Sequence, residues 1–173
     1  MEYAKGGELK RYVQSKNGLS ESEAIKIMLQ IFDAVHYWHQ KGIVHRDLKL
    51  ENVLFADTAK TNIKVVDFGL SSYWHNNNGE ITDAGTLKYM APEVLSGENL
   101  NTTKSIDIWS LGIILYALLF NGLPFLGETK EEIMNNIIKQ ELKLPESYEE
   151  NNVKLVSKEA EDLLRGKKIR QDL

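Results

Sequence analysis

The sequence contains no cysteine and only three prolines in 173 residues. Without cysteine, disulfide bonds and thiolate chemistry are excluded, and a cytoplasmic or otherwise intracellular location is the simplest expectation. No basic N-terminal stretch precedes an apolar core, so no signal peptide is expected. The longest nearly apolar run, 106–120, is interrupted by Asp107, Ser110 and Gly112. It is too short and too polar to span a bilayer, and it predicts a buried helix instead.

Excess charge of either sign is also small. The formal net charge is -4, with 42% hydrophobic and 27% charged residues. These values are ordinary for one globular domain, and they give no support to nucleic-acid binding. The one dense basic run, 165–170, lies at the end of the chain and is interpreted as a solvated tail.

Hydrophobic spacing predicts a mainly helical protein. Ser20 followed by Glu23 matches a capping box, apolar residues then recur at helical spacing, and Gly42 ends the pattern. Two short β-branched runs, 53–55 and 62–68, predict a small hairpin. Further helices are expected over 105–120, 128–140 and 157–164.

Four short motifs carry the chemistry. They are "HRDLKLEN" at 45–52, "DFG" at 67–69, "APE" at 91–93 and "DIWSLG" at 107–112. Together they offer a base, a fixed cation and two oxygen ligands, the set that phosphoryl transfer from a magnesium nucleotide requires. An Asp–Asn pair alone in a loop more often stabilises a turn than binds a metal ion. Four motifs in this order make coincidence negligible.

With these motifs the chain resembles the C-terminal lobe of eukaryotic serine/threonine protein kinases. "DFGLSS", "YMAPEVL" and "SIDIWSLGIILYALLFNGLPF" are most similar to the calcium/calmodulin-dependent and AMP-activated group. The resemblance implies a mainly α fold, a protein-kinase-like C-lobe that is a helical bundle with a small β-hairpin carrying the catalytic loop, with the N-lobe absent. It divides a partial kinase domain (1–173) into hinge (1–8), catalytic loop (45–52), activation segment (67–93) and divergent or truncated tail (165–173).

The resemblance implies a protein serine/threonine kinase that uses ATP and Mg²⁺. Asp47 would accept or orient the proton of the substrate hydroxyl, and Lys49 would hold the transferring phosphate. Thr86 would help to hold Asp47 and the acceptor hydroxyl. Asn52 and Asp67 would be the magnesium ligands.

The resemblance also assigns an ATP pocket and structural residues. Met1 would gate the back of the pocket and Leu54 would form its floor. The full expected set of ATP-binding residues is Met1, Glu2, Ala4, Glu8 and Leu54. The expected structural residues are His45 beneath the catalytic loop, Phe68 and Trp109 in the core, and Asp107 as an acceptor for the catalytic-loop backbone.

Regulation and substrate choice follow from the same resemblance. Arg46 would pair with a phosphorylated Thr82, placed there by an upstream activating kinase; the alternative is an exposed, unmodified threonine. Glu8 and Glu51 would face basic residues N-terminal to the substrate Ser or Thr; the alternative is two solvated glutamates. The expected partners are therefore basic protein substrates, without nucleic acid or membrane.

The sequence contains no G-x-G-x-x-G motif, so half of the expected ATP site has no counterpart in it. The fragment alone is then expected to lack activity unless an N-lobe is supplied. One alternative is a non-catalytic binding or decoy module. Another is an incomplete gene sequence.

Overall fold

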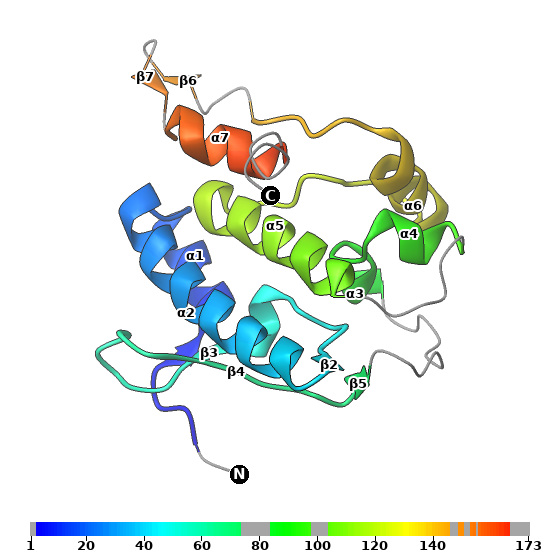
Figure 1. Cartoon of the computed structure of the whole chain (residues 1–173). Coiled ribbons are helices and arrows are strands. Elements are labelled where there is room, and N and C mark those ends of the chain that lie inside the picture. The colour runs from blue at the N-terminus through cyan, green and yellow to red at the C-terminus, as the bar shows by residue number, and fades with distance from the viewer. Residues whose placement is uncertain are drawn as a thin grey trace.

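The computed structural model describes residues 3–73, 84–97, 104–145, 149–150, 153–154 and 156–166. Helices dominate; most of the short antiparallel strands lie along one side of the bundle, and a separate pair lies at the opposite end of the molecule (Figure 1). The helices are α1 (Leu9–Lys16), α2 (Glu21–Gln40), the 3₁₀ helix η1 (Leu50–Asn52), α3 (Ala84–Leu87), α4 (Pro92–Leu95), α5 (Ser105–Phe120), α6 (Lys130–Lys139) and α7 (Lys158–Leu164). The strands are β1 (Gly7–Glu8), β2 (Ile43–Val44), β3 (Val53–Phe55), β4 (Ile63–Val65), β5 (Ser72–Tyr73), β6 (Glu149–Glu150) and β7 (Val153–Lys154).

Helix α5 forms the centre of the fold. It packs against α2 on one side and α7 on the other (Figure 1). Leu111, Ile114 and Leu118 on α5 are at most 2% exposed, as is Ile31 on α2. The predicted bounds of α5, 105–120, are confirmed. Its burial is also as expected, because a helix that is apolar on nearly every side is stable only when neighbours cover all of it.

The predicted start of α2 is confirmed by its cap. Ser20 Oγ accepts a hydrogen bond from Glu23 N, and the Glu23 carboxylate accepts one from Ser20 N. Thr129 and Ser157 cap α6 and α7 with their hydroxyl oxygens, which accept hydrogen bonds from Glu132 N and Ala160 N. Glu21, in the first turn of α2, also accepts bonds from Ser157 N and Oγ at 2.8 and 2.7 Å. The N-termini of α2 and α7 are therefore tied together.

The predicted hairpin is present as β3 and β4, which pair antiparallel with Val53 opposite Val65. A third strand, β1, was not predicted; it adds to the free edge of β3, with Glu8 opposite Leu54. Gly6 makes this pairing possible, since its backbone passes so close to Phe55 and Asp57 that no side chain would fit there. Helix α1, which begins directly after β1, was missed as well.

Two residues expected in the core differ in their burial. Phe68 is 43% exposed, so the expectation of a core position was wrong. Its ring packs edge-on against Trp38 and leans on His45, with centroids 5.3 and 4.6 Å apart, and only its inner face is covered. Trp109 is partly buried and stacks on Phe125 at 6.0 Å.

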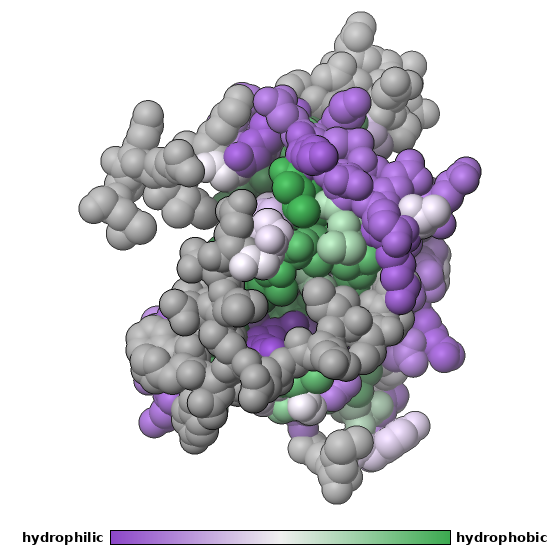
Figure 2. All heavy atoms as spheres, turned by 90° about the vertical axis from the view of Figure 1, so that its right-hand side faces the viewer, coloured by the Kyte–Doolittle hydropathy of each residue, from purple (hydrophilic) through white to green (hydrophobic). Residues whose placement is uncertain are grey.

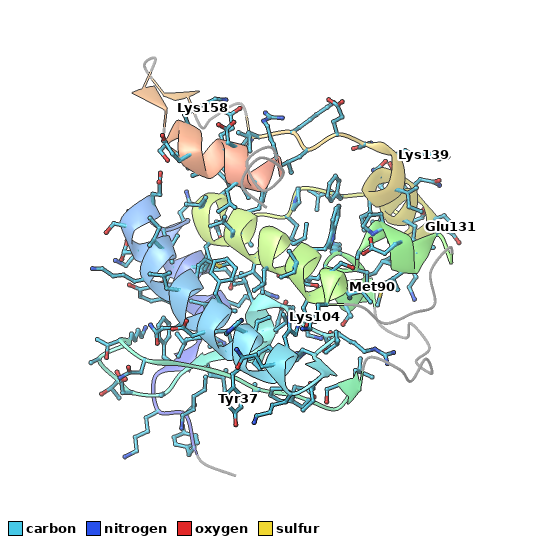
Figure 3. The ribbon with its side chains drawn as sticks, viewed as in Figure 1. Tyr37, Met90, Lys104, Glu131, Lys139 and Lys158 are labelled. Atoms are coloured by element: carbon cyan, nitrogen blue, oxygen red, sulfur yellow. The ribbon has the colours of Figure 1, made fainter. Side chains whose placement is uncertain are left out.

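Apolar and polar residues both contribute to the surface. On the face that carries α4 and α6, apolar residues lie in a recess bordered by hydrophilic ones (Figure 2). Tyr37 points outward from α2, while Met90, in the segment between α3 and α4, lies beside the first turns of α5 (Figure 3). Within the described ranges, no helix is both long and apolar enough to cross a membrane.

Candidate active site

The carboxylate of Asp47 is the centre of the candidate site. Asp47 is 6% exposed and lies between β2 and η1. Lys49 Nζ donates to Oδ1 at 3.1 Å and to Oδ2 at 2.9 Å. Asn52 Nδ2 donates to Oδ2 at 3.0 Å and to the Asp47 carbonyl at 2.8 Å. The turn of η1 brings the lysine and the asparagine to the same aspartate.

Thr86 joins this group from a distant part of the chain. Its Oγ1 accepts a hydrogen bond from Lys49 Nζ at 2.9 Å, and the residue is 7% exposed. Thr86 belongs to the short helix α3, just before the "APE" motif. Four of the predicted catalytic residues thus form one hydrogen-bonded cluster.

Asp107 holds the backbone of the catalytic loop from below. Its side chain is fully buried at the start of α5. Oδ2 accepts from His45 N at 3.0 Å, and Oδ1 accepts from Arg46 N at 3.0 Å. The predicted structural role of Asp107 is borne out by these two bonds.

Two further donors to Asp107 were not anticipated. Trp38 Nε1 and His39 Nε2 lie 3.3 and 2.7 Å from Oδ2. Since an ionised carboxylate only accepts, the His39 ring must carry its proton on Nε2. Burial by itself raises the pKa of Asp107, but the bonds from His39, His45 and Arg46 hold that pKa below its ordinary value. The charge is therefore kept in the core by four donors.

His45 is fully buried, as expected for a packing residue. Its Nδ1 accepts from Asp47 N at 3.3 Å, which leaves Nε2 to donate to the carbonyl of Val66 at 3.3 Å. Burial lowers the pKa of His45, which agrees with this neutral tautomer. The ring links the loop before Asp47 to the strand that leads to Asp67.

Asp67 lies apart from the cluster but is connected to it through the backbone. Val66 N donates to the carbonyl of Asn52 at 2.8 Å. Asp67 has φ 67°, is exposed, and accepts a bond from Gly69 N at 3.3 Å. Among the described residues there is no group of three or more His, Cys, Asp or Glu side chains that could hold a metal. The donor set of one amide oxygen and one carboxylate fits magnesium, which usually takes one or two protein ligands beside phosphate and water.

The predicted ATP-binding residues are only partly described. Glu8 and Leu54 are direct neighbours across β1 and β3, and Ala4 is half-buried just before β1. Met1 and Glu2 lie outside the described residues. The ATP-binding role of all five residues stays a prediction.

The regulatory and substrate residues have mixed outcomes. Arg46 adopts the left-handed conformation, with φ 70°. Thr82 lies outside the described residues, so the phosphothreonine pair stays a prediction. Glu51 binds Lys10 and Glu8 binds Arg11, at 2.8 and 3.0 Å. Both acidic side chains are thus paired within the chain.

An apolar cavity of about 610 Å³ lies away from these residues. Residues of α2, α5 and α7 line it, together with Glu93 and Arg165. Glu93 accepts a bond from Ser105 Oγ at 3.1 Å, and Arg165 is bonded to Glu161 at 3.0 Å. None of the Asp47 cluster lines this cavity.

Comparison with known proteins decides the family. The model of the protein kinase domain matches residues 1–169. The chain belongs to the protein kinase domain family.

The similar proteins are serine/threonine and calcium-dependent kinases. The chain is 46% identical over 145 residues to the SNF1-related protein kinase catalytic subunit alpha KIN12 of Arabidopsis thaliana, covering 84% of this chain and 28% of that protein. It is 41% identical over 165 residues to calcium-dependent protein kinase 5 of Plasmodium falciparum, covering 95% and 28%. It is 42% identical over 168 residues to CBL-interacting protein kinase 21 of Oryza sativa subsp. japonica, covering 95% and 30%. This kinase-family chain therefore spans less than a third of the length of these relatives.

Proposed function

We propose that the chain is the catalytic part of a serine/threonine protein kinase, which transfers the γ-phosphoryl group of ATP to Ser or Thr hydroxyls of proteins. The observation that carries the proposal is the hydrogen-bonded cluster of Asp47, Lys49, Asn52 and Thr86. A base, a cation and a hydroxyl from distant segments meet there, as transfer to an acceptor hydroxyl requires.

The bonding of Asp47 assigns its two oxygens different tasks. Oδ2 accepts from both Lys49 and Asn52, whereas Oδ1 accepts only from Lys49 among the described residues. Oδ1 is therefore the atom that would take or orient the proton of the acceptor hydroxyl. Lys49 would then turn toward the transferring phosphoryl group and stabilise its charge, while Thr86 keeps the ammonium group in reach.

Asn52 and Asp67 would hold Mg²⁺, and Glu8, Ala4 and Leu54 would line the nucleotide pocket. The bound magnesium nucleotide supplies the phosphoryl group and the neutralisation of its charge. Asn52 directs its amide nitrogen to Asp47, which leaves the carbonyl oxygen as the ligand atom. We also propose that this chain corresponds to the C-lobe of the kinase domain alone.

The substrates would be proteins with basic residues N-terminal to the acceptor, facing Glu8 and Glu51. Phosphorylation of Thr82 by an upstream kinase, read by Arg46, would order the activation segment. An intracellular location fits such substrates. The competing proposal is a binding or decoy module that presents the kinase surface without transferring phosphate.

The test compares the 173-residue chain with the natural gene product, the natural protein. With Mg-ATP and a Ser peptide that carries Arg residues before the Ser, the natural protein should transfer phosphate, and the matching Tyr peptide should stay unmodified. Asp47→Asn should lower the rate by about 10²- to 10⁴-fold, the usual contribution of a positioned base. Asp57→Asn is the matched control, because that carboxylate binds Thr61 and Asn62 in an exposed loop.

Full activity in the Asp47→Asn protein would contradict the proposed mechanism. If neither protein transfers phosphate or is stabilised by nucleotide, yet both still bind kinase partners, the decoy module is the better proposal.

A further inference from the structure

The two carboxylates proposed to receive basic substrate residues are each paired with a cation from α1. Lys10 Nζ lies 2.8 Å from Glu51 Oε1, and Arg11 Nε lies 3.0 Å from Glu8 Oε2. The site that should select basic peptides therefore has internal cations placed against its own acidic groups. The two pairs differ in how firmly they are held.

The Arg11–Glu8 pair is local and exposed. The two residues are three positions apart, and the Arg11 side chain is 80% exposed. Such a pair contributes little and gives way readily to a competing cation, because water solvates both partners. Glu8 therefore stays available to a substrate.

The Lys10–Glu51 pair connects two elements that are far apart in the sequence. It joins α1 to η1 across 41 positions, and the side chains are 42% and 37% exposed. Helix α1 packs directly on η1, so the ammonium group is held near the carboxylate by the fold. The fold thus holds Lys10 in place as the counter-charge of Glu51, whereas Arg11 is free to move away from Glu8.

The second oxygen of Glu51 makes this counter-charge more important. Glu51 Oε2 is buried and has no hydrogen-bond donor in the described parts of the chain. Tyr89 lies close by, and its pKa is raised by burial and by the charge of Glu51. A buried carboxylate oxygen without a donor is unfavourable, so the bond from Lys10 to Oε1 is the interaction that compensates the Glu51 carboxylate in the chain without substrate, and a substrate guanidinium could take its place.

We propose that Lys10 is a specificity-determining residue that masks Glu51 from basic substrates. The inference rests on the proposed kinase function. With Lys10 in place, a substrate Arg must displace the ammonium group before its guanidinium can form two parallel bonds to the carboxylate. The chain then selects a basic residue mainly through Glu8, and only weakly through Glu51.

Peptide binding to the purified chain tests this without requiring phosphate transfer. The probes are peptides of equal length with one Ser, a single Arg placed at successive positions before it and Gln elsewhere, plus an Arg-free peptide. Isothermal titration gives the affinity of each for the wild type, Lys10→Gln, Lys10→Arg and Lys16→Gln. Lys16 is the matched control because it lies on the same helix and pairs with Glu23 at 3.7 Å.

In Lys10→Gln, peptides with Arg at one position should bind about two- to fivefold more tightly, the range of a half-exposed ion pair. The Arg-free peptide should bind as it does to the wild type, and Lys10→Arg and Lys16→Gln should keep the wild-type pattern. The gain should disappear in 1 M salt, where the Debye length is about 3 Å.

Three outcomes overturn the inference. They are equal affinities in the wild type and Lys10→Gln, a gain that includes the Arg-free peptide or Lys16→Gln, and no peptide binding by either protein. None of these outcomes bears on the proposed kinase function, which the phosphotransfer assay tests separately.

Discussion

Removing the Asp107 carboxylate should destabilise the whole fold, because four donors converge on it in the core. In Asp107→Ala, the amides of His45 and Arg46 lose their acceptor, as do the ring nitrogens of Trp38 and His39. Each buried donor left unpaired costs about 1–3 kcal/mol. The contributions are not additive, and about 3–5 kcal/mol is expected, the cost of breaking a buried charged group's interactions.

That loss is large compared with a typical domain stability of about 5–15 kcal/mol. Urea unfolding followed by circular dichroism at pH 7 measures it as a lower midpoint. Asp107→Asn should lose less, since the side chain keeps its shape and one acceptor oxygen. Asp33→Ala, on the exposed face of α2, should stay within about 0.5 kcal/mol of the wild type.

The pH dependence gives an independent check. Because the pKa of Asp107 is below its ordinary value of 3.8 in the folded chain, the ionised group contributes stability that is complete above pH 3.8. That stability is lost as the pH falls through the lower folded value, and the loss should be missing in Asp107→Asn. If Asp107→Ala unfolded at the same urea concentration as Asp33→Ala, the four-donor anchor would have no energetic role.

Further predictions concern packing and chemistry. Ile114→Ala should cost about 2–5 kcal/mol in urea unfolding, because Ile114 is fully buried and leaves a cavity. Gly112→Ala should stabilise by about 0.5–1 kcal/mol, since no atom beyond the neighbouring residues and backbone of its own helix lies within 4 Å of the added methyl group; an unchanged melting temperature would argue against open space there. Gly6→Ala should be destabilising, because the methyl group overlaps Phe55 and Asp57, and thermal melting measures the loss. Lys49→Met should lower kcat for phosphotransfer more than it changes the KM for peptide, since its bonds to Asp47 and Thr86 place it beside the proposed base; a change confined to KM would contradict this.

Helices with strong local signals could be predicted from the sequence. Ser20 and Glu23 specify the start of α2 by their own hydrogen bonds, and α5 is apolar on nearly every side, so its bounds follow from composition. Helix α1 was missed because eight residues, with Leu9 and Val13 as the buried pair, give too short a periodic pattern. Strand β1 was missed for a different reason: it has two residues, and its pairing depends on the edge of β3.

The candidate site divides in the same way. The residue types in "HRDLKLEN" already required a base, a cation and an amide at close spacing, and Asp47, Lys49 and Asn52 do meet within one turn. Spacing could not reveal that Trp38 and His39 donate to Asp107, because the bonds span 69 and 68 positions. The exposure of Phe68 was missed because an aromatic residue within a motif suggests a core position. The sequence does not show whether other residues cover the outer face of its ring.

The sequence by itself determined the chemistry that this protein can offer, since residue types and their local order set the available donors, acceptors and charges. Only the tertiary structure decided which charges meet. Glu51 was predicted to face a basic residue of the substrate, and the packing of α1 on η1 also places Lys10 against it at 2.8 Å. Contacts between distant elements depend on how helices pack around a shared core, and no local pattern records that packing.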